Sequence, residues 1–381
     1  MSPIVLSAGQ GRPSLADVLP NCLAAMRGAP NELGLPAVRG AVVLLVDGLG
    51  ALNLRARSGH ARRIVEGWGR RDTALSFPST TASAITSLTT GVRAGEHGVV
   101  GYSVLDRAAG AERNQISGWG AGMEPEAWQP VPTVFERAGE LCPGAEAFAV
   151  GLPQYADSGL TRASLRGARY LAAGTMEERV RAALDAVAER ERPLVYCYVA
   201  ELDQAGHALG WGSDAWLAAL EELDRAVGIL RAELPRDIGL LITADHGMLD
   251  IPERRQLEIA DDGPLLDGVI AMAGEPRLRH LYLAPGDEGR AGELAARWRE
   301  AEGARAEIAT RDEAIAAGWL GPVVTDAARD RLGDVLVAAT KEVVYFASSM
   351  TGRARELVGH HGSVSAEETT VPLIRHGAFA R

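Results

Sequence analysis

Three short apolar runs, each leading into an acidic residue, limit what this chain can fold into more than any other feature. The runs and the acids that follow them are AVVLLV (41–46) with Asp47, LVYCYVA (194–200) with Asp203, and IGLLIT (238–243) with Asp245. Continuous apolar runs of this length are typical of strands that are buried on both faces of a parallel sheet. Each run is therefore predicted to be a strand of one central sheet.

Helical patterns separate these strands. Apolar residues recur at helical spacing through 213–234, between the second and third runs, and another helix is predicted over 176–189. Strand, helix and strand in this order imply a right-handed crossover and a parallel sheet. Weaker strands are predicted at 281–283 and 334–338. We expect an α/β fold with a doubly wound, mostly parallel central sheet and helices on both faces, within a single domain over residues 1–381.

Two stretches fit this pattern poorly and are interpreted as insertions, at about 104–170 and about 250–330. They contain no motif that we can assign, and we expect them to contribute substrate specificity. Arg277 and His280 stand just before a predicted strand in the second insertion. They either face a substrate or lie on a solvated strand edge.

The acidic balance of the chain argues against several classes of partner. Its 381 residues carry a formal net charge of −11, with no basic block that would favour nucleic acid or an anionic membrane surface. No apolar run approaches the ~20 residues of a membrane span, and Met1–Leu6 lacks the basic start of a signal peptide. We therefore expect a soluble, cytoplasmic protein, and the sequence carries no signal for a particular oligomeric state.

Histidines accompany the acids at the strand ends. His246 follows Asp245, His207 lies four residues after Asp203, and His361 belongs to a GHHGS segment near the C-terminus. In an open parallel sheet, ligands bind outside the carboxyl ends of the strands, so these side chains are expected to converge. Taken singly, each piece also fits a turn, a helix cap or a surface loop.

Taken together, the strand-end residues predict a metal centre. Carboxylates and imidazoles without thiolates suit Zn²⁺, and Mn²⁺ or Fe²⁺ less exclusively. Six such ligands suffice for two metal ions that share a nucleophile, as in phosphate displacement. The candidates are Asp47, Asp203, His207, Asp245, His246 and a histidine of the pair His360–His361.

A hydroxyl-rich segment supplies candidates for the nucleophile. Residues 79–90 follow Pro78 and precede Gly91, and they are predicted to form a helix with hydroxyls at its N-terminus. A hydroxyl at a helix N-terminus next to a metal is well placed to lose its proton, and the free amides there favour a phosphate. Capping and close packing account for most of these hydroxyls, but need not account for all.

These motifs together resemble the alkaline phosphatase superfamily, and in particular its type I phosphodiesterase/nucleotide pyrophosphatase branch. The resemblance spans residues 40–375 or so and implies an alkaline-phosphatase-like fold. The matching segments, in order, are VDG (46–48), FPSTT (77–81) to TG (90–91), EHGVVG (96–101), Asp203 to His207, ADHGM (244–248) and HG (361–362).

The resemblance also implies roles for individual residues. The family's threonine nucleophile, which forms a phospho-threonine intermediate, matches Thr81, with Thr80 as the alternative. An asparagine that contacts a phosphoryl oxygen in the family is replaced here by Tyr102, which weakens the inference of a nucleotide substrate. The implied zinc ligands are Asp203, His207 and His361 for one ion, and Asp47, Asp245 and His246 for the other.

The resemblance implies a zinc phosphodiesterase or nucleotide pyrophosphatase whose partner is a small phosphate ester, with a nucleotide as one candidate. Two alternatives stay open. The same metals could serve a phosphomonoesterase or a phosphonate hydrolase. A catalytically silent member would bind a nucleotide or act as a scaffold.

Overall fold

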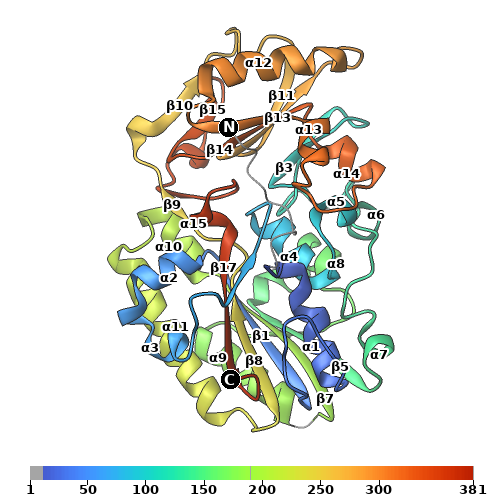
Figure 1. The fold of residues 1–381 in the computed structure, drawn as a ribbon, viewed down its shortest axis with the longest axis vertical. Helices are drawn as coiled ribbons and strands as arrows, with labels where there is room; N and C mark the ends of the chain where they lie inside the picture. The colour runs from blue at the N-terminus through green and yellow to red at the C-terminus, as the bar shows by residue number, and fades with distance from the viewer. Residues whose placement is uncertain (1–11, 189, 381) are drawn as a thin grey trace.

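The structure is a computed structural model that describes residues 12–188 and 190–380. A seven-stranded central sheet forms the lower part of the molecule in Figure 1. Its strand order is β2-β17-β8-β1-β7-β5-β6. The strands are β1 (Gly40–Val46), β2 (Thr73–Leu75), β5 (Ala145–Gly151), β6 (Arg169–Ala172), β7 (Arg192–Val199), β8 (Ile238–Thr243) and β17 (Thr370–Gly377).

The central sheet is mostly parallel, as predicted. β1 pairs in parallel with both β7 and β8, and β5 pairs in parallel with β7 and β6. Only β17 runs against its neighbours β8 and β2. The predicted central strands are confirmed, and their carboxyl ends meet at one edge of the sheet.

Helices cover both faces of this sheet (Figure 1). Alternate side chains of β1 belong to two separate hydrophobic clusters, because successive residues of a strand point to opposite faces. One cluster packs against α9 (Met176–Ala188) and α11 (Asp214–Glu233), and the other against α1 (Val18–Met26) and α4 (Thr81–Thr90). The doubly wound α/β prediction is therefore confirmed.

Shorter helices lie beside the central sheet and beside a second, smaller sheet. They are α2 (Ala51–Ala56), α3 (Arg62–Val65), α5 (Ala94–His97), α6 (Pro125–Trp128), α7 (Ala138–Leu141), α8 (Gly159–Ser164), α10 (Glu201–Leu209), α13 (Arg311–Ala316), α14 (Asp326–Arg331) and α15 (Ala366–Thr369).

A smaller antiparallel sheet lies at the top of Figure 1, with α12 (Ala291–Glu302) packed on its outer face. Its strands, in spatial order, are β11 (Val269–Glu275), β12 (Leu278–Leu283), β14 (Val335–Ala339) and β13 (Ala306–Thr310). Three two-stranded pairs accompany it: β10 (Gln256–Ile259) with β15 (Val344–Ala347), β9 (Leu249–Asp250) with β16 (Gly359–His360), and β3 (Ser103–Asp106) with β4 (Ala111–Asn114).

The predicted insertion bounds need correction. The first insertion, 104–170, was wrong over its second half, because β5 and the first residues of β6 belong to the central sheet. β5 reads AEAFAVG, and its alanines and glutamate give a weaker apolar signal than the three central runs. The second insertion, 250–330, was too short, because its strands are completed by β14 and β15 farther along the chain.

None of the helices in the described part of the chain combines the length and the apolar character needed to cross a membrane. Met1–Leu6, on which the expectation about a signal peptide depends, lies outside the described residues.

Candidate metal centre and adjoining cavity

One group of potential metal ligands consists of Asp47, Asp245 and His246, all buried. Asp47 follows β1 directly, and Asp245 lies two residues beyond the neighbouring β8. Nε2 of His246 is 3.2 Å from Oδ1 of Asp47 and 3.6 Å from Oδ2 of Asp245. The backbone N–H of Gly48 donates to Oδ1 of Asp245 at 3.1 Å, which holds the two loops together.

A second group consists of Asp203, His207 and His361. Asp203 and His207 lie four residues apart in α10, which begins just after β7, so they share one face of the helix. Nε2 of His207 is 3.4 Å from Oδ1 of Asp203 and 3.2 Å from Nε2 of His361. His361 arrives from the segment after β16, more than 150 residues later in the chain.

The three histidines are oriented by backbone carbonyl groups. Nδ1 of His207 lies 2.8 Å from the carbonyl oxygen of Gly359, and Nδ1 of His361 lies 2.8 Å from that of Ser79. Nδ1 of His246 is 3.2 Å from the carbonyl oxygen of Gly247. An Nδ1–H that donates in this way leaves Nε2 unprotonated and available as a metal ligand. All three Nε2 atoms face the carboxylates of their own group.

The two groups adjoin one another. The imidazoles of His246 and His361 are stacked, with ring centroids 3.6 Å apart and an interplanar angle of 11°. Because these residues belong to different groups, any movement of one loop against the other changes the separation between the groups.

Buried carboxylate oxygens that accept no hydrogen bond indicate that cations fit here. Among the described residues, Oδ1 of Asp47, Oδ1 of Asp203 and Oδ2 of Asp245 are buried and accept no hydrogen bond. Burial, followed by the neighbouring Asp47 carboxylate, raises the pKa of Asp245 to about 8 and the pKa of Asp203 well above its ordinary value. Like charges that are crowded and desolvated in this way are relieved by a bound cation. Each group offers three oxygen and nitrogen ligands within 4.8 Å of one another, which suits a divalent metal ion.

Thr81 and Thr80 occupy different environments. Thr81 is the first residue of α4, and its Oγ1 lies 3.3 Å from Nε2 of His246. The Thr80 hydroxyl points elsewhere and donates to Oε1 of Glu275 at 2.8 Å. Thr81 therefore faces the ligand groups, whereas the hydroxyl of Thr80 is engaged by the smaller sheet.

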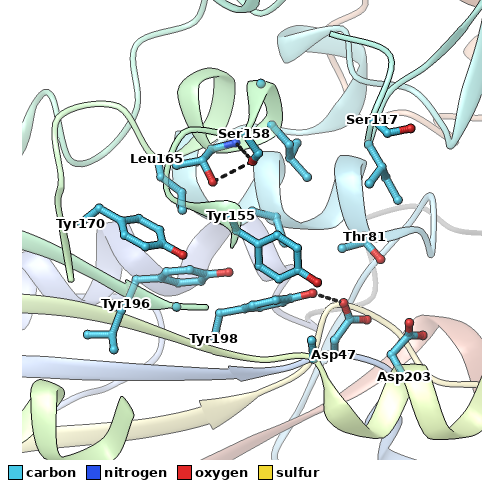
Figure 2. A pocket seen from close by; sticks show the side chains of 18 of the residues that line it. Asp47, Thr81, Ser117, Tyr155, Ser158, Leu165, Tyr170, Tyr196, Tyr198 and Asp203 are labelled. Carbon is cyan, nitrogen blue, oxygen red and sulfur yellow. Dashed lines mark hydrogen bonds between the residues drawn. The ribbon is translucent and has the colours of Figure 1, made fainter. Parts of the chain in front are cut away.

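A cavity of about 550 Å³ opens beside Thr81, Asp47 and Asp203 (Figure 2). One of its walls is aromatic, and no lysine, arginine or histidine of the described chain lines it. Among the described residues, Asp47 and Asp203 are the only charged ones that line it. The aromatic residues that line it are Trp119, Tyr155, Tyr170, Tyr196 and Tyr198.

The sequence analysis missed the role of Tyr198. Its hydroxyl donates a short hydrogen bond to Oδ2 of Asp47, as Figure 2 shows. Burial, and then the Asp47 carboxylate, raise the pKa of Tyr198 well above its ordinary value, so the phenol stays protonated and donates. The available signal was the second of two tyrosines in a mostly apolar strand, five residues before Asp203.

Three other residues singled out in the sequence lie outside this cavity. Tyr102 precedes β3, is 36% exposed and does not line the cavity. Burial, and then the charge of Glu275, raise the pKa of its phenol. Arg277 and His280 are 0% and 1% exposed within the smaller sheet. The solvated strand edge was therefore wrong for both residues, and neither of them lines this cavity.

The fold has clear relatives among solved structures. Murine ectonucleotide pyrophosphatase/phosphodiesterase 5 superimposes with a TM-score of 0.66 at 19% identity, covering 88% of each chain. Another structure of that protein is an inactive threonine-to-alanine variant in complex with AMP. Phosphonoacetate hydrolase from Sinorhizobium meliloti 1021, in complex with phosphonoacetate, superimposes with a TM-score of 0.67 at 17% identity, covering 90% of this chain and 91% of that one.

Sequence comparison gives the family directly. No curated protein sequence matches the chain. The family model described as type I phosphodiesterase/nucleotide pyrophosphatase matches residues 41–364, a range that holds both ligand groups, Thr81 and the cavity. The resemblance read from the motifs is therefore confirmed, and the chain belongs to the type I phosphodiesterase/nucleotide pyrophosphatase family.

Proposed function

We propose that this phosphoester hydrolase is a two-zinc phosphodiesterase that uses Thr81 as its nucleophile. The observation that carries the proposal is that two three-ligand groups adjoin the hydroxyl of Thr81, beside a cavity that Thr81, Asp47 and Asp203 line. Asp47, Asp245 and His246 would hold one zinc ion on the Thr81 side. Asp203, His207 and His361 would hold the other.

Bound zinc ions would supply positive charge that lowers the pKa of the threonine hydroxyl and offsets charge on the phosphoryl and leaving oxygens. Thr81 loses its hydroxyl proton to solvent, and its Oγ1 forms a bond to phosphorus as the bond to the leaving alcohol oxygen breaks. That oxygen takes up a proton from water. Water then attacks the phospho-threonine, which releases a phosphate monoester and restores the Thr81 hydroxyl. The inactive threonine-to-alanine variant of the murine relative supports a threonine in this role.

The cavity favours an ester group that is uncharged and flat. Its aromatic wall offers stacking surface, and Ser117, Ser158 and Thr161 add hydroxyls. Beyond the proposed zinc sites, a carboxylate or a second phosphate would enter a space that no cationic side chain of the described residues lines. Burying an unpaired anion there is costly. A phosphodiester with one neutral aromatic group, such as a nucleoside, fits this space better than phosphonoacetate does.

Thr81→Ala tests the nucleophile. Removing Oγ1 leaves all six predicted ligands in place, so we expect zinc content to be unchanged and kcat to fall by about 10⁴-fold or more. Thr80→Ala is the matched control, because it removes a hydroxyl that bonds to Glu275 and should leave kcat within about tenfold. Full activity of the Thr81 variant would reject this assignment, and loss of activity only in the Thr80 variant would transfer the role to Thr80.

A substrate panel tests the choice of ester group. We expect the p-nitrophenyl ester of a nucleoside monophosphate to be cleaved with a higher kcat/KM than p-nitrophenyl phosphate, and phosphonoacetate not to be cleaved. Release of phosphate from phosphonoacetate as the preferred reaction would assign the chain to phosphonate hydrolysis instead. Zinc binding without turnover of any of these compounds would indicate a catalytically silent binding protein.

A further inference from the structure

A fully buried ion pair connects the smaller sheet to the region of the metal centre. Arg277, in the turn between β11 and β12, contacts Glu368 of α15 through two hydrogen bonds. Nε donates to Oε1 and Nη2 donates to Oε2, each at 2.7 Å, and both side chains are 0% exposed. Neither residue lines the cavity, so neither is placed to touch a substrate.

Glu368 is bonded to both loops that carry metal-site histidines. Its Oε1 accepts from the backbone N–H of Ser363 at 2.9 Å, two residues after His361. Its backbone carbonyl oxygen accepts from the N–H of Gly247 at 2.8 Å, the residue that follows His246. One residue therefore holds the loops of two histidines that belong to different ligand groups.

Arg277 in turn anchors the carboxylate of Glu368 to the smaller sheet. Its Nη1 donates to the carbonyl oxygens of Lys341 and Val343, both at 2.9 Å, on the segment that leads into β15. The guanidinium is thus anchored to the smaller sheet while it pairs with the carboxylate. A planar guanidinium with two parallel bonds to a carboxylate sets orientation as well as distance.

We propose that Arg277 and Glu368 are positioning residues that set the spacing of His246 and His361, and through it the zinc affinity of the metal centre. The proposal rests on the proposed two-zinc site. Because the stacked rings of His246 and His361 join the two groups, a shift of either loop alters how both groups can bind their ions. Outer partners that orient metal-site residues typically contribute 10–100-fold to metal affinity.

Zinc affinity and stability must be measured separately, because a buried ion pair also affects folding. Glu368→Gln keeps the side-chain shape and removes the charge. We expect its zinc dissociation constants, measured by chelator competition, to rise about 10-fold or more. Asp334→Asn is the matched control, because Asp334 is 1% exposed, pairs with Arg107 and Arg311, and touches neither histidine loop. The control should lower the Tm and leave zinc affinity unchanged.

A double variant separates positioning from the cost of an unpaired buried charge. Arg277→Met with Glu368→Met removes both charges together, which in buried ion pairs is often neutral for stability. Because no unpaired charge stays buried, we expect the Tm of the double variant to be nearer to the wild type than that of Glu368→Gln. Because the backbone N–H of Ser363 loses its acceptor, we expect the zinc affinity of the double variant to stay low. Wild-type zinc affinity in both Glu368 variants would overturn the positioning role. Failure of the wild-type protein to bind zinc would instead reject the proposed function.

Discussion

At the scale of single residues, the predicted ligands depend on neighbours that local sequence does not reveal. The convergence of the six predicted ligands could be anticipated because acids and histidines follow strands whose carboxyl ends must meet at one edge. Tyr198 and Glu275 could not, because a tyrosine in an apolar strand and a glutamate at a strand end have no distinctive pattern. Their contacts to Asp47 and Thr80 join segments far apart in the chain.

Tyr198→Phe tests the most direct of these contacts. The change removes the hydroxyl that donates to Oδ2 of Asp47 and leaves the ring in place. We expect zinc affinity at the group of Asp47, Asp245 and His246 to fall about 10–100-fold, measured by chelator competition. Tyr196→Phe is the control, because Tyr196 lines the same cavity without bonding to a predicted ligand. Equal zinc affinity in the Tyr198 variant and the wild type would show that the hydroxyl does not support the site.

His97 gives a prediction about pH. Burial, and then the charge of Arg331, lower its pKa to about 3, while its Nδ1 accepts from the N–H of Val99 at 3.1 Å. Between about pH 6.5 and pH 3, His97 is therefore protonated in the unfolded chain and neutral in the folded chain. The stability contributed by neutral His97 is present above that pH and is lost as pH falls from about 6.5 towards 3, by about 1.4 kcal/mol per unit.

His97→Asn should make this pH dependence shallower. An asparagine at this position can accept the same backbone N–H and does not titrate. Urea denaturation of metal-free protein at pH 7 and pH 5 gives the difference in unfolding free energy for wild type and variant. We expect the wild type to lose about 2 kcal/mol more than the variant between these conditions. Equal losses would show that His97 is not kept neutral by its surroundings.

At the scale of elements, apolar runs predicted β1, β7 and β8 because these strands are buried on both faces. β5 and β6 were not predicted from the sequence, because they lie towards the sheet edge, where fewer side chains must be apolar. β6 in particular has no buried residue: its two end residues are exposed and the two between them are half-buried. Edge strands are therefore the part of this sheet that local hydrophobicity predicts least well.

Two glycine substitutions test how elements hold the second ligand group. A Cβ on Gly359 of β16 would lie 2.5 Å from the backbone oxygen of Gly206 in α10, so Gly359→Ala should push the two elements apart. Because Nδ1 of His207 bonds to the Gly359 carbonyl, we expect weaker zinc binding and a stability loss of about 1–3 kcal/mol.

Gly292→Ala is the matched control for this change. A Cβ on Gly292, in the first turn of α12, meets no atom within 4 Å. We expect it to raise the unfolding free energy by about 0.4–1 kcal/mol and leave zinc binding unaltered. Thermal denaturation and chelator competition report both quantities, and unchanged zinc binding in Gly359→Ala would contradict the coupling of β16 to His207.

At the scale of the whole molecule, the smaller sheet closes one side of the site that the central sheet builds. Its long-range contacts, such as those of Glu275 and Arg277, reach residues about 90 to 195 positions away. Local patterns could indicate weak strands in this region, but not their antiparallel order or their contact with the ligand loops. Those depend on tertiary packing, which overrides local preference.

The central claim is that the two ligand groups form one two-zinc phosphodiesterase centre. The most direct test is to quantify zinc in purified protein and to compare kcat/KM for bis-p-nitrophenyl phosphate and p-nitrophenyl phosphate before chelation, after chelation and after zinc repletion. The account predicts about two zinc ions per chain, a preference for the diester, loss of turnover on chelation and recovery with zinc. Protein that binds no zinc, or that keeps full diester activity when metal-free, would contradict it.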